Sequence, residues 1–140
     1  METLDPTLLG TELEQARAEI RRLTELTHAL MAAQGEMGYG AVIVDGQQVL
    51  YANDAFCELS GYTLEELIAL PSFFNLVPDE ERRVLQSRMA QRLMGEAVED
   101  HYATAFYHRQ GHLISLEAVV KAAHLDGRPH VIAMVRDVAL

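Results

Sequence analysis

The chain has 140 residues, a formal net charge of −10, and 49% hydrophobic against 23% charged residues. These proportions fit one folded domain with an appended element and exclude a disordered chain. A chain this acidic, without a basic stripe, is a poor partner for nucleic acid or anionic membranes.

The location in the cell follows from what the sequence lacks. No apolar run approaches the roughly 18 residues that indicate a membrane span, and the acidic start is unlike a signal peptide. The single cysteine, Cys57, excludes an internal disulfide and a cysteine-rich metal site. We therefore expect a cytoplasmic protein that does not enter a membrane.

The first predicted element is a helix over residues 12 to 34. Thr11 and Glu14 fit a capping box at its start, and Gly35 follows as a stop signal. We treat residues 1–38 as one unit that serves dimerisation or sheet cover, and residues 39–140 as the domain proper.

Along this helix, mostly apolar residues recur at alternating spacings of four and three. This seam consists of Leu9, Leu13, Ala16, Ile20, Leu23, Thr27 and Leu30. The pattern is typical of a two-stranded coiled coil or of a helix that lies on a sheet. Two hypotheses therefore stay open, a seam packed between the protomers of a homodimer and a seam packed on its own domain.

The next stretch predicts a hairpin and two short helices. Asp45-Gly46 separates the apolar runs 41–44 and 49–51, as in a tight β-turn. Asn53 or Asp54 can then cap one short helix, and Thr63 with Glu66 forms a capping box for a second one, which Pro71 ends.

The remaining chain predicts one long helix and three strands. The helix opens at Pro78-Asp79 and stops at Gly95, and the strands span residues 99–108, 112–124 and 130–138. This order indicates an α+β fold with a five-stranded antiparallel sheet. The last two strands are apolar at odd and even positions, so the N-terminal helix or a partner subunit is expected to cover the second face of the sheet.

Three short motifs carry a family resemblance. Asn53-Asp54-Ala55-Phe56 is followed by Leu59-Ser60-Gly61-Tyr62-Thr63 and then by Glu65-Glu66-Leu67. In these runs, and in the ending Arg136-Asp137-Val138, residues 39 to 139 resemble the PAS (Per-Arnt-Sim) sensory domain. The resemblance implies the PAS fold, with sheet order 2-1-5-4-3 and helices cupping one face.

The resemblance also implies a cleft between the sheet and the helices. The side chains expected to line it as a candidate ligand pocket are Phe56, Phe73, Phe74, Leu85, Met89, Leu93, Leu116 and Met134. Aromatic and methionine side chains at such spacing also build ordinary cores, so a pocket for a small apolar ligand and a plain core both remain open.

The sequence lacks the motifs that would indicate a cofactor or a catalytic site. The predicted long helix lacks the histidine that oxygen-sensing relatives use for haem, and Pro71-Ser72-Phe73 opens the segment where light-sensing relatives carry a flavin-reactive cysteine motif. His108 with His112, and His124 with His130, supply two ligands per turn, too few for structural zinc, so we expect solvated histidines and no metal. No residues form a catalytic constellation, and we expect neither haem nor flavin nor enzymatic activity.

We therefore interpret the sequence as a sensory and dimerisation module of a bacterial signal-transduction protein, such as the input domain of a histidine kinase. Its signal is expected to leave through the last strand, past Asp137, to an effector domain beyond Leu140. The alternative is a stand-alone, cofactor-free PAS module that acts through protein interaction.

Overall fold

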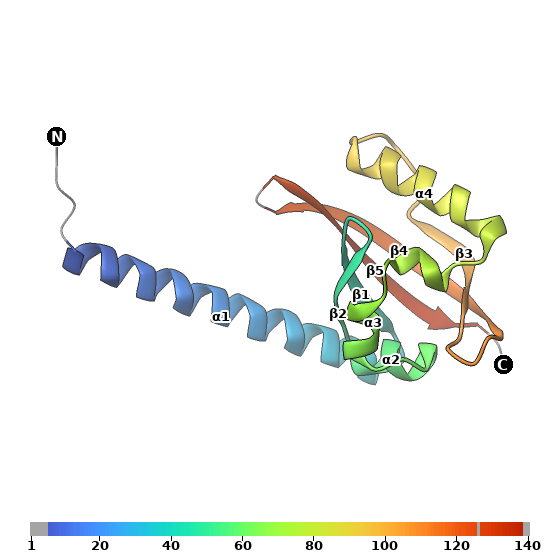
Figure 1. The fold of residues 1–140 in the computed structure, drawn as a ribbon, viewed down its shortest axis with the longest axis horizontal. Helices are drawn as coiled ribbons and strands as arrows, with labels where there is room; N and C mark the ends of the chain where they lie inside the picture. The colour runs from blue at the N-terminus through green and yellow to red at the C-terminus, as the bar shows by residue number, and fades with distance from the viewer. Residues whose placement is uncertain (1–5, 126, 139–140) are drawn as a thin grey trace.

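The computed structural model describes residues 6–125 and 127–138 (Figure 1). In chain order, the elements are α1 (Pro6–Glu36), β1 (Gly40–Asp45), β2 (Gln48–Ala52), α2 (Asp54–Ser60), α3 (Leu64–Ala69), the 3-10 helix η1 (Phe73–Leu76), α4 (Asp79–Leu93), β3 (His101–Tyr107), β4 (Leu113–Leu125) and β5 (Arg128–Asp137). The predicted strands differ from these bounds by at most two residues at each end.

The five strands form one antiparallel sheet in the order β2-β1-β5-β4-β3. This confirms both the predicted α+β class and the expected strand order. The central strand is β5, which pairs with β1 on one side and β4 on the other, and Val42 and Val44 of β1 pair with Ala133 and Val131 of β5. Residue 126, within the predicted turn between β4 and β5, lies outside the described residues.

The start and end of α1 differ from the prediction. The helix already begins at Pro6, a residue suited to a first helical turn, and the hydroxyl of Thr11 donates to the carbonyl oxygen of Thr7 inside the helix. The predicted Thr11 capping box is therefore wrong. At the other end Gly38, with φ +91°, follows the helix, and Gly35 lies within it rather than ending it. A Cβ at position 35 would sit 3.2 Å from the side-chain nitrogen of Asn53, so the glycine permits the close approach of that side chain.

The short helices start as predicted. Asn53, rather than Asp54, caps α2 by accepting from the backbone N–H of Phe56, and Thr63 and Glu66 form both bonds of a capping box on α3. In both helices the capping side chain directly precedes the helix and bonds to a backbone N–H group three residues later.

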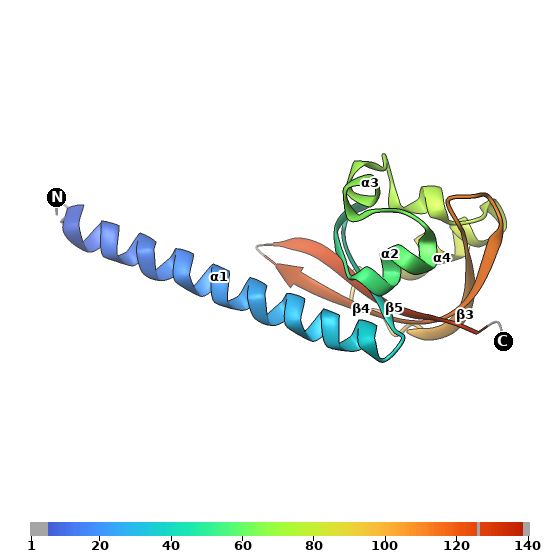
Figure 2. The ribbon, with the colours of Figure 1, turned by 90° about the horizontal axis from the view of Figure 1, so that it is seen from below.

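The sheet has an inner face covered by helices and a largely uncovered outer face. Figure 2 shows α2, α3 and α4 on one side of the strands, with α1 projecting far beyond the sheet. The core, which includes the fully buried Phe56, Leu67 and Val135, lies on the inner side.

The end of α1 reaches one edge of the outer face. His28 stacks on Tyr51 of β2 with ring centroids 3.9 Å apart, and Met31 is buried. Ile132 and Leu113 remain 41% and 56% exposed. The described part of α1 therefore covers only the β1–β2 side, and none of the described residues supplies the predicted cover over β4 and β5.

Candidate functional site

The site suggested by the sequence, a cleft between sheet and helices, exists as a small inner cavity of about 40 Å³. It lies beneath η1 and α4 and above the inner face of the sheet. Most of its lining is apolar, from Val44, Phe73, Phe74, Leu85, Met89, Phe106, Ala118, Val120, Val131, Ala133 and Val135. This lining suits a small apolar group or a tightly packed core.

Three polar side chains also line the cavity, Thr104 and Tyr102 of β3 and Arg92 of α4. Thr104 is 8% exposed, and burial raises the pKa of the Tyr102 hydroxyl. The guanidinium of Arg88 lies 4.2 Å from the centroid of the Tyr102 ring, a cation–π geometry. One wall of the cavity is therefore polar, with the Arg92 side chain as its charged member.

Four of the eight predicted pocket residues line this cavity: Phe73, Phe74, Leu85 and Met89. The other four do not meet there.

Phe56 and Leu116 are fully buried elsewhere in the core, where the ring of Phe56 meets that of Phe106 edge-on at 6.5 Å. Leu93 lines a separate surface groove, which Met89 also lines.

The prediction for Met134 is wrong. Ala133 and Val135 line the inner cavity, and alternation along a strand sends the residue between them to the other face. Met134 instead lines an outer-face groove with Val119. The same alternation could have identified Thr104, because it lies two residues before the core residue Phe106 on one strand.

Asn53 joins three parts of the fold through one side chain that is 3% exposed. Its carbonyl oxygen accepts from the backbone N–H groups of Ala41 at 2.9 Å and Phe56 at 3.0 Å. Its amide nitrogen donates to the carbonyl oxygens of Met31 at 2.7 Å and Tyr39 at 3.1 Å. The sequence predicted only the cap on α2, whereas the structure adds the link to α1.

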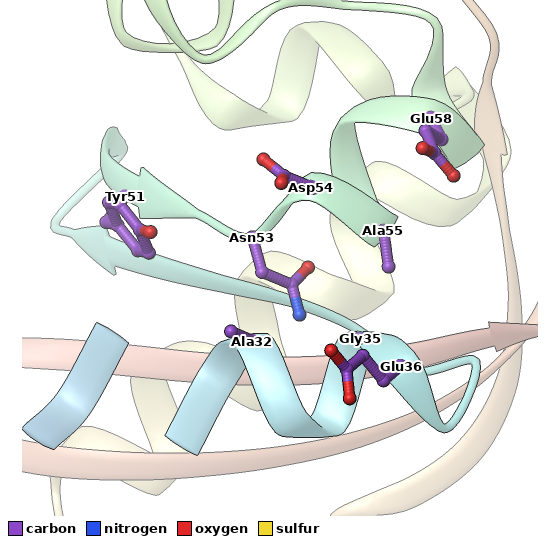
Figure 3. A pocket seen from close by; sticks show the side chains of 8 residues that line it. All are labelled: Ala32, Gly35, Glu36, Tyr51, Asn53, Asp54, Ala55 and Glu58. Atoms are coloured by element: carbon purple, nitrogen blue, oxygen red, sulfur yellow. The ribbon is translucent and has the colours of Figure 1, made fainter. Parts of the chain in front are cut away.

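A surface notch of about 290 Å³ opens where α1 meets α2 (Figure 3). It is lined by Ala32, Gly35, Glu36, Tyr51, Asn53, Asp54, Ala55 and Glu58. In Figure 3 the amide nitrogen of Asn53 is directed toward α1 across this notch. The notch therefore marks the junction between the helix and the domain.

The seam of α1 is exposed along its length. The exposed fractions of Leu13, Ile20, Leu23 and Leu30 are 50%, 64%, 51% and 62%. The polar seam residue Thr27 is satisfied within the helix, because its hydroxyl donates to the carbonyl oxygen of Leu23 at 2.8 Å. Packing of this seam on its own domain is therefore not observed in the described residues.

The histidine pairs do not gather a metal site. No group of three or more histidine, cysteine, aspartate or glutamate side chains within residues 6–125 and 127–138 is arranged to hold an ion. His108 stacks on His112, with ring centroids 4.4 Å apart. His130 is buried rather than solvated as predicted, with Nε2 4.0 Å from a carboxylate oxygen of Asp45.

Asp137 is the last residue of β5, is exposed, and pairs in register with Leu116 of β4. Residues 139–140, where the sequence places the approach to an output linker, lie outside the described residues. Among the residues that the structure describes, no helix combines the length and the apolar character needed to cross a membrane.

Comparison with protein families gives a match to the PAS domain over residues 38–139. Among curated proteins, the chain is 36% identical over 87 residues to the voltage-gated inwardly rectifying potassium channel KCNH2 of Sus scrofa. That alignment covers 60% of this chain and only 7% of the channel.

Two solved structures show the same fold. A domain of a sensory box sensor histidine kinase/response regulator from Geobacter sulfurreducens has a TM-score of 0.66 at 22% identity, covering 84% of this chain and 96% of that one. A light-oxygen-voltage domain studied with a flavin analogue has a TM-score of 0.62 at 18% identity, covering 79% and 85%.

Proposed function

We propose that this chain, which belongs to the PAS domain family, is the sensory and dimerisation module of a bacterial signal-transduction protein. In this proposal two copies pair through the seam of α1, the inner cavity receives the stimulus, and β5 passes the response past Asp137 to an effector domain. The module itself carries no reaction and holds neither haem nor flavin.

One observation carries the proposal: a 31-residue helix presents an apolar seam that its own domain leaves exposed. Leu9, Leu13, Ile20, Leu23 and Leu30 are each at least 45% exposed. A stripe at alternating spacings of four and three is buried when two such helices pair. A second copy of the chain therefore covers the stripe without any change in the domain.

The buried Asn53 link supports a role in signalling. Its bond to Met31 lies in α1, while its bonds to Ala41 and Phe56 lie in the domain. In this proposal a movement of the sheet or of α2 reaches α1 through one buried, hydrogen-bonded side chain. The cytoplasm is the compartment we propose, since a single unpaired cysteine suits a reducing environment.

Sedimentation equilibrium of the full chain tests the proposal with Leu23→Glu. Truncating a seam leucine removes roughly 2 kcal/mol of packing on each helix, and a buried carboxylate adds to that cost. We expect monomers at concentrations where the wild type is dimeric. Ala18→Glu, away from the seam on α1, is the matched control and should leave the dimer intact.

A dimer that persists in both Leu23→Glu and Ile20→Glu would contradict pairing through α1. An absorbance scan of the same samples tests the cofactor part of the proposal. A Soret band, or flavin absorbance retained through gel filtration, would overturn it.

A further inference from the structure

Two buried polar atoms stand out in the inner cavity, the Oγ1 atom of Thr104 and the Nε atom of Arg92. Neither has a hydrogen-bond partner among the described residues, and both belong to side chains that line the cavity. Thr104 is 92% buried, since its exposed fraction is 8%. Buried polar groups in folded proteins are nearly always hydrogen-bonded, so both atoms point to a bound group with acceptor atoms.

The charge around these atoms favours an anion. Arg92 is the only charged side chain among the described residues that line the cavity. The terminal Nη2 atom of Arg92 donates to the carbonyl oxygen of Glu99 at 3.1 Å. The Nε–H of Arg92 takes no part in that hydrogen bond. Arg88 lies against the ring of Tyr102 behind this wall, and its Nη2 atom is 3.9 Å from a carboxylate oxygen of Glu99, so Arg92 supplies the positive charge at the cavity itself.

The rest of the cavity limits the size and chemistry of the bound group. The rest of the lining is aromatic and aliphatic, including Phe73, Phe106 and Val120. The volume of about 40 Å³ leaves room for only a few heavy atoms beyond the anionic group. An inorganic anion would leave this apolar surface without a partner, whereas a short alkyl chain covers it.

Met89 lies between the inner cavity and the surface. Met89 and Phe74 line both the inner cavity and a surface groove of about 310 Å³ beside α4. A methionine side chain is unbranched and changes rotamer readily. A change of the Met89 rotamer would therefore open the cavity toward the groove and enlarge it for a ligand.

We infer that the inner cavity binds a short-chain aliphatic monocarboxylate, with the Thr104 hydroxyl and the Arg92 Nε–H donating to its carboxylate oxygens. The inference rests on the proposed function, because it names the chemical class of the stimulus that the cavity receives. The alkyl chain lies among the aromatic side chains, and the anionic end faces Arg92.

The test is a titration of the isotopically labelled full chain with sodium butyrate, followed by amide NMR shifts. We expect saturable shifts in β3 and α4. Butyramide, which has the same shape without the charge, and sodium chloride at matched ionic strength serve as controls. Butyramide should bind at least tenfold more weakly, because hydrogen bonds to charged groups are roughly twice as strong as neutral ones.

Two variants test the named donors. Thr104→Val keeps the shape of the side chain and removes the hydroxyl, and Arg92→Met keeps the stem and removes the charge. Each should weaken butyrate binding roughly tenfold or more. Arg83→Met, an exposed arginine on the same helix, should leave the affinity unchanged.

Equal affinity for butyrate and butyramide, unchanged affinity in Thr104→Val, or no saturable shift would each overturn the inference. A crystal soaked in butyrate with only ordered water between Thr104 and Arg92 would also overturn it. The wild-type comparison and Thr104→Val keep the test decisive if Arg92→Met does not fold. Sedimentation of the same samples separates the two proposals, since a dimer without butyrate binding removes this inference alone.

Discussion

The side-chain amide nitrogen of Asn53 donates a 2.7 Å hydrogen bond to the backbone carbonyl oxygen of Met31, twenty-two residues earlier in the chain. Both residues are buried, with exposed fractions of 3% and 5%. The last turns of α1 are therefore attached to the domain at the residue that also caps α2. This attachment makes α1 part of the folded unit rather than a free tail.

Asn53→Asp removes the hydrogen bonds that the Asn53 side chain donates and keeps those that it accepts. The new carboxylate still accepts from Phe56 and Ala41, so the cap on α2 survives, but it faces the carbonyl oxygens of Met31 and Tyr39 without a proton to donate. We expect a loss of about 2–4 kcal/mol in unfolding free energy and faster amide exchange at the end of α1.

Asn75→Asp is the matched control for this change. Asn75 is exposed, and its side-chain oxygen accepts from the backbone N–H of Ser72, a role that a carboxylate keeps. Urea unfolding should show little change for Asn75→Asp. Equal stability of the two variants would mean that the donor side of Asn53 contributes nothing.

Gly61→Ala tests the contact between α2 and the β3–β4 turn. Gly61 has φ +81°, and a Cβ there would overlap the Cε1 atom of His108. Backbone strain and overpacking together predict a loss of about 2–4 kcal/mol. Gly46→Ala, at φ +61° with no atom within 4 Å of the added carbon, should cost only about 1 kcal/mol.

The double variant Gly61→Ala/His108→Ala checks the cause. Removing the imidazole ring relieves the overpacking and leaves the backbone strain. We expect the double variant to lose less stability than the sum of the single variants in thermal unfolding. Strict additivity would show that His108 is not the obstacle.

Glu117 links stability to pH on the outer face of the sheet. Its carboxylate lies 2.5 Å from Nε2 of His101 and 2.6 Å from Nη2 of Arg136, and these two hydrogen bonds, the one from His101 being the larger effect, lower the pKa of Glu117. A lowered carboxyl pKa adds stability above the ordinary value near 4.3, and this stability is lost as the pH falls through the lowered value.

Glu117→Gln removes this effect. We expect the Tm difference between the wild type and Glu117→Gln to be largest near neutral pH and to shrink as the pH falls below about 4. The change should be small, because both partners are exposed to solvent. Glu80→Gln, on the exposed side of α4, is the control, and a pH-independent difference for Glu117→Gln would contradict the assignment.

Asp137→Ala tests the proposed exit of the signal. An exposed interaction at the end of β5 contributes no more than about 1 kcal/mol, which is small for folding but comparable with the bias that shifts a two-state linker. We expect a Tm within a few degrees of the wild type and altered output when the chain is fused to a kinase or cyclase. Unchanged output across several fusion registers, with Glu96→Ala as control, would leave Asp137 without a signalling role.

Much of the fold could be predicted because its signals are local. Asn53, Thr63 and the Asp45-Gly46 turn act on backbone groups within three residues of themselves, and the structure keeps each of them in its predicted role. The start of α1 could not be fixed in this way. A threonine hydroxyl suits a cap and also suits a bond to the carbonyl four residues earlier, as Thr11 shows.

The sequence by itself determined the order of the elements, the antiparallel class of the sheet and the family resemblance, because capping, turn chemistry and apolar runs are written in short stretches. Only the tertiary structure decided which residues meet. Met134 and Ala133 are both apolar and adjacent on β5, so their side chains lie on opposite faces of the sheet. The packing of the helices decides that Ala133 lies on the inner face and Met134 on the outer one. Thr104 and Arg92 come to one cavity from separate elements, and this juxtaposition depends on pairings between distant segments that no local pattern encodes.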